Sequence, residues 1–452
     1  MELQGKRVVV VGTGISGCGA VKLLNAESAD VILYDSNEKA DEGKIRERLN
    51  GENAKIVLGE FTEEMKTQTE LLVISPGVPI DSELVLDMKK RNVPVWGEIE
   101  LAFHFEKGRV IAITGTNGKT TTTALTGQIM RAANPKTFVV GNIGLSYTGE
   151  VLKTSEDSNT VAEISSFQLE SIENFHPVVS AILNITPDHL NRHHTMECYE
   201  QTKERICENQ TSDEVVVLNY DDERLRAFGE KTQAKVVWFA RVNRPTTGTF
   251  AFLDGETIKY SEDGKVTDLM NVHEMNLIGA HNYENVMAAI CIAKAAGVPD
   301  SVILEQVRIF KAVEHRIEYV ATKNDVMYYN DSKGTNPEAA VKAIEAMSRP
   351  TILIGGGYDK GSEYDLYIKA FEGHVKELVL IGQTADKIEA CARKYGFTNI
   401  VRCDSLKEVV EVCVRDSNPG DAVLLSPACA SWGMFDNYEQ RGDMFKDYVN
   451  AL

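Results

Sequence analysis

The stretch from Val110 to Met130, VIAITGTNGKTTTTALTGQIM, decides the fold of the central part of this chain. Four apolar residues lead through a glycine-rich turn into a helix-forming run. A buried strand followed by such a turn and a helix is typical of a parallel α/β sheet. The turn also predicts a phosphate-binding loop, because its backbone N–H groups can cradle phosphate oxygens while Lys119 supplies a positive charge.

This loop is a shortened variant of the usual phosphate-loop consensus. The consensus places its first glycine five residues before the Gly-Lys pair, where this chain has Ile113, and the nearest earlier glycine is Gly115. The hydroxyl of Thr120 can hold Mg²⁺. We expect nucleotide phosphates to contact the residues of this turn: Gly115, Thr116, Asn117, Gly118, Lys119, Thr120 and Thr121.

Strand-like runs alternate with helical patterns on both sides of this stretch. We therefore predict an α/β protein of three domains: a Rossmann-like domain at 1–97, a central P-loop ATPase-like domain at 98–312 and a Rossmann-like C-terminal domain at 313–452. Short alternating runs with turn residues predict an antiparallel hairpin within 243–268.

The composition excludes several classes of protein. The 452 residues include 48 basic and 67 acidic side chains, and the net charge of −19 disfavours nonspecific nucleic-acid binding. No window approaches the roughly 18 consecutive apolar residues of a membrane span, and the N-terminus lacks a signal-peptide cleavage site. The eight scattered cysteines fit reduced thiols. We expect a cytoplasmic monomer without a nucleic-acid partner or membrane insertion.

A second glycine motif lies near the N-terminus. Gly12, Gly14 and Gly17 follow a strand and open a helix, and Asp35 ends the next strand. This spacing matches the dinucleotide-binding fingerprint, but the same geometry binds other nucleotide diphosphates, such as a UDP-sugar, or simply closes a tight turn. The turn at Ser75–Gly77 follows another strand and is expected at the same crevice.

Polar residues follow two strands of the central block. Glu163 and His189 stand where ligands gather in open α/β sheets, and together they are candidates to hold Mg²⁺. His193 and His194 are interpreted as surface residues, since their spacing demands no metal. Lys203 lies in a polar helical stretch and, from the residues alone, is interpreted as a solvated lysine.

Three strand-end loops of the last block carry the cations Lys333, Lys360 and Arg441, which could surround an anionic substrate. Asp331 lies in the first of these loops. Together with Lys333 it could bind a ligand as an acid and a cation, but the same residues are also explained by an Asx-turn followed by a helix N-cap. Arg316 is a candidate to stack on a base or pair with a phosphate.

Taken together, these segments resemble the Mur ligases, ATP-dependent enzymes that build the peptide stem of peptidoglycan precursors. Family-wide signals are GTNGKTTTT (115–123), ISSFQLE (164–170), ITPDHL (185–190), IGAHNYENVMAA (278–289) and EHRIE (314–318). The segments NDSKGTN (330–336), SPACASW (426–432) and NYEQRGDMF (437–445) are similar to the member that adds D-glutamate to UDP-N-acetylmuramoyl-L-alanine through an acyl phosphate.

The resemblance implies a role for each matching residue. The catalytic residues it implies are Lys119, Glu163, His189 and Lys203, of which Lys203 is carbamylated. The residues implied to hold two Mg²⁺ ions are Thr120, Glu163, His189 and Lys203. ATP contacts beyond the phosphate loop are Asn282, Asn285, Arg316, Asp331 and Lys333. The UDP end binds at Ile15, Ser16, Asp35, Ser36, Gly77 and Asn142, and the amino acid at Thr335, Lys360, Ser431, Tyr438 and Arg441. The chain departs from close relatives at Asn37, at Gly334 (often Ala) and at Tyr438 (commonly Phe).

Three other functions remain as alternatives. An NAD-dependent dehydrogenase would explain the first glycine motif but leaves the phosphate loop unused. A P-loop NTPase acting as a switch would not need three polar strand-end loops in the last block. A folate-polyglutamate ligase shares the chemistry, but the N-terminal nucleotide-binding block and the SPACASW segment disfavour it.

Overall fold

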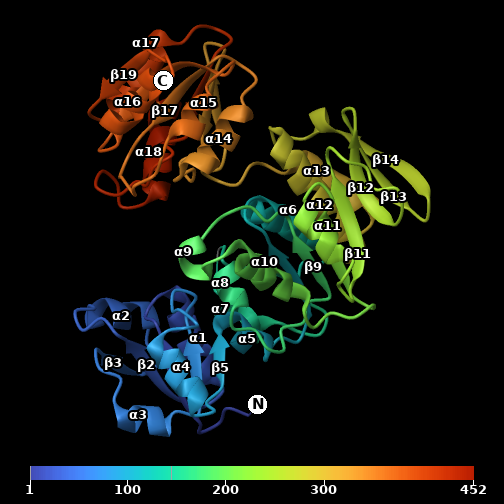
Figure 1. The fold of residues 1–452 in the computed structure, drawn as a ribbon, viewed down its shortest axis with the longest axis vertical. Helices are drawn as coiled ribbons and strands as arrows, with labels where there is room; N and C mark the ends of the chain where they lie inside the picture. Colours follow the sequence, from blue (N-terminus) through green and yellow to red (C-terminus); the bar gives the residue numbers. More distant parts are fainter. Residues whose placement is uncertain (1, 144) are drawn as a thin grey trace. The chain divides into compact units, whose positions relative to one another are not determined.

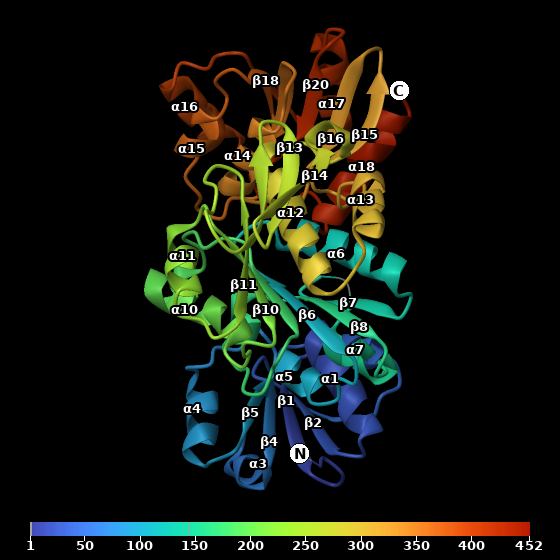
Figure 2. The same ribbon diagram turned by 90° about the vertical axis from the view of Figure 1, so that its right-hand side faces the viewer.

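The structure is a computed structural model that describes residues 2–143 and 145–452. The chain forms two compact units (Figures 1 and 2). The first comprises Met1–Val272 with Glu284–Arg308, and the second comprises His273–Tyr283 with Ile309–Leu452. The first unit contains two sheets, and the second contains one.

The first sheet is five-stranded and wholly parallel, with the order β3-β2-β1-β4-β5. Its strands are β1 (Arg7–Val11), β2 (Asp30–Asp35), β3 (Lys55–Leu58), β4 (Leu71–Ile74) and β5 (Val95–Gly97), and the helices between them are α1 (Ile15–Ala26), α2 (Glu42–Leu49), α3 (Glu63–Gln68) and α4 (Glu83–Lys90). The strand order reverses between β1 and β4, which places the crevice expected for a ligand beside the β1–α1 turn.

Glycines at the end of β1 allow the chain to turn sharply into α1. Gly12 has a φ of +103°, and a Cβ built there would lie 2.6 Å from the hydroxyl oxygen of Ser75. A Cβ at Gly17 would lie 1.9 Å from the carbonyl oxygen of Gly12. Among the described residues, apart from its neighbours along the chain, no atom lies within 4 Å of the Cβ position of Gly14. Packing therefore requires two of the three glycines, while the third borders open space.

The second sheet has nine strands in the order β14-β13-β12-β11-β10-β9-β6-β8-β7. Its strands are β6 (Arg109–Thr114), β7 (Thr137–Gly141), β8 (Asn159–Glu163), β9 (Val179–Ile182), β10 (Val215–Asn219), β11 (Lys235–Ala240), β12 (Thr249–Asp254), β13 (Thr257–Glu262) and β14 (Lys265–Asn271). The strands from β7 to β12 are parallel, whereas β13 and β14 extend the sheet in antiparallel pairing. The antiparallel hairpin predicted within 243–268 is therefore present, as an extension of the parallel sheet.

Helices connect and flank the strands of this sheet. They are α5 (Glu98–Phe103), α6 (Lys119–Ala133), α7 (Tyr147–Glu150), α8 (Ser166–Leu169), α9 (Leu190–His193), α10 (Met196–Glu204), α11 (Glu223–Gly229), α12 (Ala280–Ala295) and α13 (Asp300–Ile309). The residues of β6, beginning at Val110, are almost completely buried, as their uninterrupted apolar run predicts.

The second unit contains a six-stranded sheet with the order β15-β16-β20-β17-β18-β19. Its strands are β15 (Glu318–Lys323), β16 (Val326–Asn330), β17 (Thr351–Gly355), β18 (Val375–Ile381), β19 (Ile400–Cys403) and β20 (Ala422–Leu425), and its helices are α14 (Pro337–Glu345), α15 (Asp365–Lys369), α16 (Ala385–Lys394), α17 (Leu406–Asp416) and α18 (Tyr438–Asn450). Only the β15–β16 pair of this sheet, all of whose residues are described, is antiparallel. The loops that follow β16, β17 and β20 therefore meet at one edge.

The three sheets confirm the predicted α/β class. The proposed boundaries at 97/98 and 312/313 remain predictions. Within residues 2–143 and 145–452, no helix is both long and apolar enough to cross a membrane.

We expect Gly17→Ala to lower the free energy of unfolding by about 1–3 kcal/mol, because the added methyl group must displace the backbone of Gly12. Gly14→Ala is the matched control, since Gly14 has a φ of −79° and open space around its Cβ position. Chemical denaturation of both variants measures the difference. Equal midpoints for the two variants would contradict this account of the turn.

Candidate active site

The phosphate loop lies between β6 and α6, as the sequence predicts. Gly115 and Gly118 have φ values of +151° and +83°, which residues with a side chain rarely adopt. A Cβ at Gly118 would lie only 2.2 Å from the Oδ1 atom of Asn285 in α12. The first N–H groups of α6 have no partner within the helix, so this turn has the form of an anion-binding site.

Two lysines meet at one backbone oxygen of this loop. The Lys119 ammonium donates to the carbonyl oxygens of Gly115 and Thr116, at 2.8 and 2.9 Å. The Lys203 ammonium, from α10, donates to the same Gly115 oxygen at 2.9 Å. Burial, and then the positive charge of Lys119, lowers the pKa of Lys203 well below its ordinary value.

The interpretation of Lys203 as a solvated lysine is wrong. Its residue is 1% exposed, and its ammonium lies 4.7 Å from the ring centroid of Tyr199 on the same helix. The polar sequence of α10 gives no periodic signal for this burial. Only the packing of α10 against the phosphate loop turns the lysine inward.

Two residues that the sequence analysis did not single out brace the phosphate loop. The Tyr199 hydroxyl lies 3.1 Å from Oγ1 of Thr116. The Oδ1 atom of Asn184 accepts from the backbone N–H of Asn117 at 2.8 Å, and the Asn184 side-chain amide donates to the Asn117 carbonyl. No motif spacing marks Tyr199 or Asn184, because both contacts join segments far apart in the sequence.

Glu163 ends β8, next to the strand that leads into the phosphate loop. It is 1% exposed, and its Oε1 atom accepts from the side-chain amide of Asn142 at 2.8 Å. Its Oε2 atom is buried and has no hydrogen-bond partner among the described residues. A buried carboxylate oxygen without a partner is costly, and a divalent cation with oxygen ligands would satisfy it.

The histidines of the following loop differ in burial. His189 has a half-exposed side chain whose ring centroid lies 4.8 Å from that of Phe167. It is the N-cap residue of α9 and has a φ of +52°. His193 is 2% exposed, so its interpretation as a surface residue is wrong, whereas His194 is exposed as expected. His193 lies 3.0 Å from the Ser166 hydroxyl, and burial lowers the pKa of its imidazole. The short helix α9 turns it inward.

The residues predicted to bind the nucleotide diphosphate lie at the ends of strands, most of them in the first sheet and Asn142 after β7 of the second. The Thr13 hydroxyl donates to Asp35 at 2.8 Å, and Ile15 is 74% exposed at the start of α1. Ser16 is half-buried beside it, while Ser36 and Gly77 are exposed in the turns after β2 and β4.

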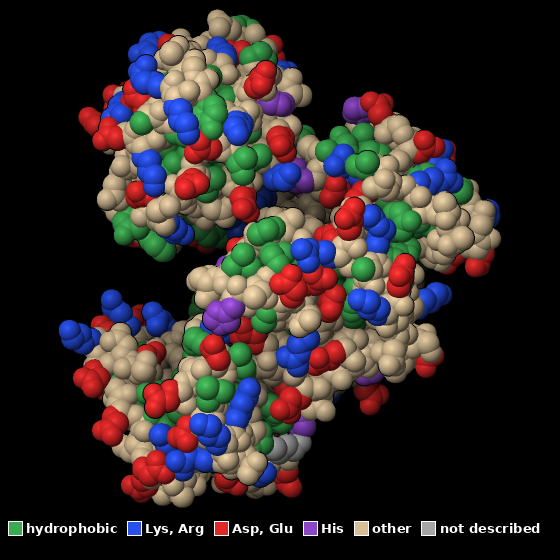
Figure 3. Space-filling view, in the orientation of Figure 1, with side chains coloured by type: hydrophobic (Ala, Val, Ile, Leu, Met, Phe, Trp, Pro, Cys, Tyr) green, Lys and Arg blue, Asp and Glu red, His purple; other side chains and the backbone are tan. Residues whose placement is uncertain are grey.

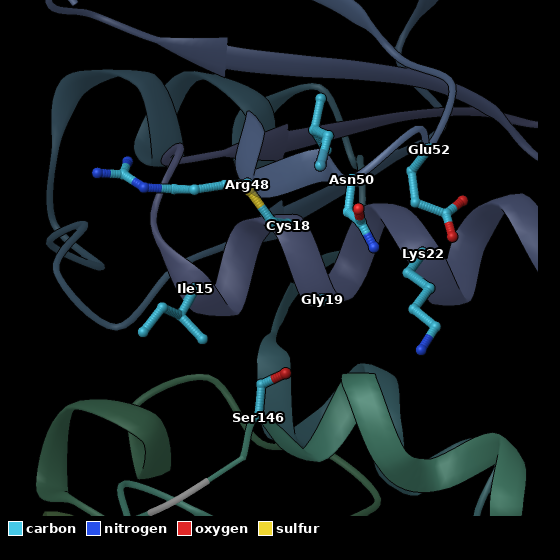
Figure 4. A pocket seen from close by; sticks show the side chains of 9 residues that line it. Ile15, Cys18, Gly19, Lys22, Arg48, Asn50, Glu52 and Ser146 are labelled. Atoms are coloured by element: carbon cyan, nitrogen blue, oxygen red, sulfur yellow. The ribbon is translucent and has the colours of Figure 1, made fainter. Parts of the chain in front are cut away.

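A cavity of about 340 Å³ adjoins the N-terminal end of α1 (Figure 4). In this view the side chains of Ile15, Cys18 and Lys22 come from α1, Arg48 comes from α2, and Ser146 lies in the loop before α7. Arg48 also donates to the Thr13 carbonyl at 3.3 Å. Ile15, at the β1–α1 turn, therefore also lines this partly polar cavity.

In the second unit, Asp331 is buried at the end of β16. Its carboxylate accepts from the Ser426 hydroxyl at 2.7 Å and from the Ile317 N–H at 3.3 Å. Burial raises the pKa of Asp331 to about 6, against the lowering effect of the positive charge of Arg316. A Cβ at Gly334 would lie 2.3 Å from Oδ2 of Asp331, so the glycine at this position makes room for the carboxylate.

Arg441 does not face an open substrate site, contrary to the expectation from its sequence position. It is 1% exposed, and its guanidinium donates to the hydroxyl and carbonyl oxygens of Ser332 and to the Cys429 carbonyl, at 2.9, 2.8 and 3.2 Å. Burial lowers its pKa to about 10. Because the first turns of α18 pack under the loop after β16, this arginine holds that loop from below.

The other two cations lie over aromatic rings. The Lys333 ammonium is 5.6 Å from the ring centroid of Tyr438, and the Lys360 ammonium is 4.8 Å from that of Trp432. Thr335 is half-buried and Ser431 is buried in the same group of loops. Backbone bonds join these loops: Gly356 donates to Pro427 and Tyr358 donates to Ala430. The predicted amino-acid residues thus gather at one edge of the third sheet.

The predicted ATP contacts outside the phosphate loop are divided between the two units. Asn285 lies in α12 against Gly118, and the hydroxyl of Thr122 donates to its Oδ1 atom at 3.4 Å. Asn282, one turn earlier, donates to the Ile278 carbonyl. Arg316 and Lys333 belong to the second unit, where each is half-buried.

Comparison with known proteins identifies the family. Three family models match the chain: a MurD-like Mur ligase N-terminal domain at 6–97, a Mur ligase middle domain at 113–293, and a Mur ligase glutamate ligase domain at 315–429. A protein of Lachnospira eligens named UDP-N-acetylmuramoylalanine--D-glutamate ligase is 67% identical over 452 residues, covering 100% of both chains. The chain belongs to the Mur ligase family.

Other Mur ligases agree with this assignment. The similarly named protein of Clostridioides difficile is 45% identical over 457 residues and is covered in full. Solved structures show the same fold at lower identity. The Mur ligase MurC of Thermotoga maritima has a TM-score of 0.62 at 19% identity, with 99% of each chain covered. A pseudomurein peptide ligase of Methanothermus fervidus has a TM-score of 0.59 at 17% identity, covering 99% of this chain and all of that one. The predicted three-domain architecture and family are confirmed.

We expect the buried Asp331 to make this Mur ligase less stable as the pH rises from about 4 to 7. The folded state raises the pKa from 3.8 to about 6, so it keeps a proton that the unfolded chain has lost, and stability falls by about 3 kcal/mol through this window. Asp331→Asn removes this step. Denaturant unfolding of both proteins across that pH range measures the difference.

Asp447→Asn, at an exposed carboxylate on α18, is the control for this measurement. It should follow the wild-type profile. Parallel profiles for wild type and Asp331→Asn would show that the Asp331 carboxyl group is not held protonated by the fold.

Proposed function

We propose that this Mur ligase forms an amide bond between D-glutamate and UDP-N-acetylmuramoyl-L-alanine, with conversion of ATP to ADP, in cytoplasmic peptidoglycan precursor synthesis. The observation that carries the proposal is the 67% identity, over the full chain, to a protein named UDP-N-acetylmuramoylalanine--D-glutamate ligase. The match of 315–429 to a glutamate ligase domain supports the same choice of amino acid. Family membership disfavours the dehydrogenase and the switch-type NTPase, and the full-length match disfavours a folate ligase.

The reaction requires that a carboxylate be activated before an amine can attack it. The γ-phosphoryl group of ATP passes to the carboxylate of the L-alanine end, and the resulting acyl phosphate loses phosphate when the D-glutamate amine attacks. Positioning and charge neutralisation dominate such transfers. Lys119, held by the Gly115 and Thr116 carbonyls, provides a fixed positive charge beside the N–H groups of the phosphate loop, Gly115 to Thr121.

We propose that two Mg²⁺ ions bind around Glu163. The buried Oε2 atom of Glu163, which has no hydrogen-bond partner in the described part of the chain, supports this proposal. We assign the metal positions to Thr120, Glu163, His189 and Lys203. When bound, Mg²⁺ neutralises negative charge on the transferring phosphoryl group.

Lys203 suits a carbamylated role because its amine is held in a buried setting next to another cation. A depressed pKa provides a larger neutral fraction, and only a neutral amine reacts with CO₂. The carbamate formed carries oxygen atoms that can bind a metal, which an ammonium group cannot do. This change would also remove the repulsion between Lys203 and Lys119.

The remaining site residues are assigned as the resemblance to the Mur ligases implies. The UDP end binds at the crevice of the first sheet and at the adjoining loop: Ile15, Ser16, Asp35, Ser36, Gly77 and Asn142. ATP meets Asn282, Asn285, Arg316, Asp331 and Lys333, and D-glutamate meets Thr335, Lys360, Ser431 and Tyr438. Arg441 acts on this group indirectly, through its bonds to Ser332.

The proposal includes a monomer with domains at 1–97, 98–312 and 313–452, no nucleic-acid partner and no membrane insertion. A protein that binds nucleic acid commonly carries a continuous basic stripe. On the face shown in Figure 3, acidic and basic side chains are intermixed. The net charge of −19 also supports a protein without a nucleic-acid partner.

We expect phosphate release from ATP and Mg²⁺ to require both UDP-N-acetylmuramoyl-L-alanine and D-glutamate. Lys119→Ala should lower turnover by about 10²-fold or more, because the charge beside the phosphates is lost. A coupled phosphate assay, with L-glutamate, L-lysine and diaminopimelate as competitors, measures both effects. Thermal unfolding verifies that the variant is folded.

Preference for another amino acid in this assay would keep the ligase and overturn the choice of D-glutamate. Release without any amino acid would return weight to the switch-type NTPase. Unchanged ligation by Lys119→Ala would contradict the assignment of the phosphate loop.

We expect Lys203 to carry a carbamate. Protein equilibrated with ¹³C-bicarbonate should show a carbamate resonance in the ¹³C NMR spectrum that Lys203→Arg lacks, with a loss of turnover of about 10²-fold in that variant. Lys231→Arg, at an exposed lysine of the same unit, should keep both the signal and the activity. A fully active wild-type protein without the resonance, or a signal that persists in Lys203→Arg, would refute the modification.

A further inference from the structure

An aromatic pair stands exposed at the carboxyl edge of the third sheet. Tyr358 follows β17 and Trp432 follows β20, and their ring centroids lie 5.6 Å apart at an interplanar angle of 61°. Tyr358 is 39% exposed and Trp432 is 54% exposed. Exposed apolar surface of this kind often marks a binding site, so groups that bind a ligand are expected in the surroundings of the pair.

The pair is held in place by the backbone below it. Tyr358 donates its N–H to the Ala430 carbonyl at 2.8 Å, and the two residues form an antiparallel bridge. Trp432 directly follows Ser431, which is 4% exposed. The edge-to-face contact of the two rings adds to this support. The indole is therefore fixed to the loop after β17 as well as to its own loop.

Lys360 places its ammonium 4.8 Å from the ring centroid of Trp432. The neighbouring carboxylate, Asp359, accepts from the Gly361 N–H at 2.7 Å and pairs with Lys387. Within the part of the chain that the structure describes, no carboxylate lies within 4.0 Å of the Lys360 ammonium. A ring face attracts a cation without neutralising its charge, so Lys360 is held in position and can still bind an anion.

We propose that Trp432 is a positioning residue for amino-acid binding: its indole holds the Lys360 ammonium where a carboxylate of D-glutamate binds, and Tyr358 fixes the indole. This inference rests on the proposed function, in which Lys360 contacts D-glutamate. Lys333 lies over Tyr438 at the same edge of the sheet, so a second lysine is placed in the same way.

The test separates binding of the amino acid from the chemical step. Trp432→Leu removes the π face and should raise KM for D-glutamate about 3- to 5-fold, the effect of one exposed cation–π contact, while kcat and the KM values for ATP and the UDP-linked substrate stay unchanged. Trp432→Phe keeps a ring and should restore most of the affinity. Trp432→Gln is a second ring-free variant that adds no apolar surface.

A double-mutant cycle ties the effect to Lys360. In a Lys360→Gln background, Trp432→Leu should cause no further rise in KM for D-glutamate. Tyr395→Leu is the matched control, because the ring centroid of Tyr395, which directly follows α16, lies 5.1 Å from the Lys394 ammonium. This control should keep the wild-type KM.

The outcomes distinguish the inference from the proposed function. A wild-type protein without D-glutamate-dependent turnover would overturn the proposed function. An active wild type would overturn the positioning role if the ring-free variants kept its KM, or if the effects of the Trp432 and Lys360 substitutions were additive. Thermal unfolding of each variant accompanies the kinetics, so that loss of folding is not read as loss of affinity.

Discussion

The carbonyl oxygen of Gly115 accepts hydrogen bonds from two lysines, and the central site depends on this shared contact. Two ammonium groups this close repel each other strongly where water is excluded. The fold keeps them together by burying Lys203 under the phosphate loop and bracing that loop through Tyr199 and Asn184. The result is a concentrated positive field and a lysine with a lowered pKa, set next to a strand that carries a buried carboxylate.

The second unit uses its buried charges differently. Asp331 and Arg441 are both 1% exposed, and each binds a serine of a neighbouring strand-end loop. Their burial costs free energy, which the hydrogen bonds partly offset. These two residues fix the loops from inside, while Lys333 and Lys360 lie over aromatic rings at the edge. The buried Asp331 and Arg441 thus hold the strand-end loops together, and Lys333 and Lys360 at the edge are left to bind a ligand.

The sequence predicts correctly those features for which apolar periodicity or a short motif carries the signal. The strand from Val110, the phosphate loop and the glycine turn at Gly12 are local features, since each depends on residues adjacent in the chain. It failed for Lys203 and His193, and it misjudged the direction of Arg441. All three lie in polar stretches, where nothing in the spacing tells a buried ionisable group from a solvated one.

By itself, the sequence determined the α/β class, the position of each glycine turn and the membership of the Mur ligases, because backbone conformation and strand burial follow from local residue types. Only the tertiary structure decided which polar side chains become partners. It placed Lys203 beside Lys119, left one oxygen of Glu163 without a hydrogen-bond partner among the described residues and set Trp432 under Lys360. These contacts join segments separated by tens of residues, so they arise only when strands pack side by side and their carboxyl ends meet.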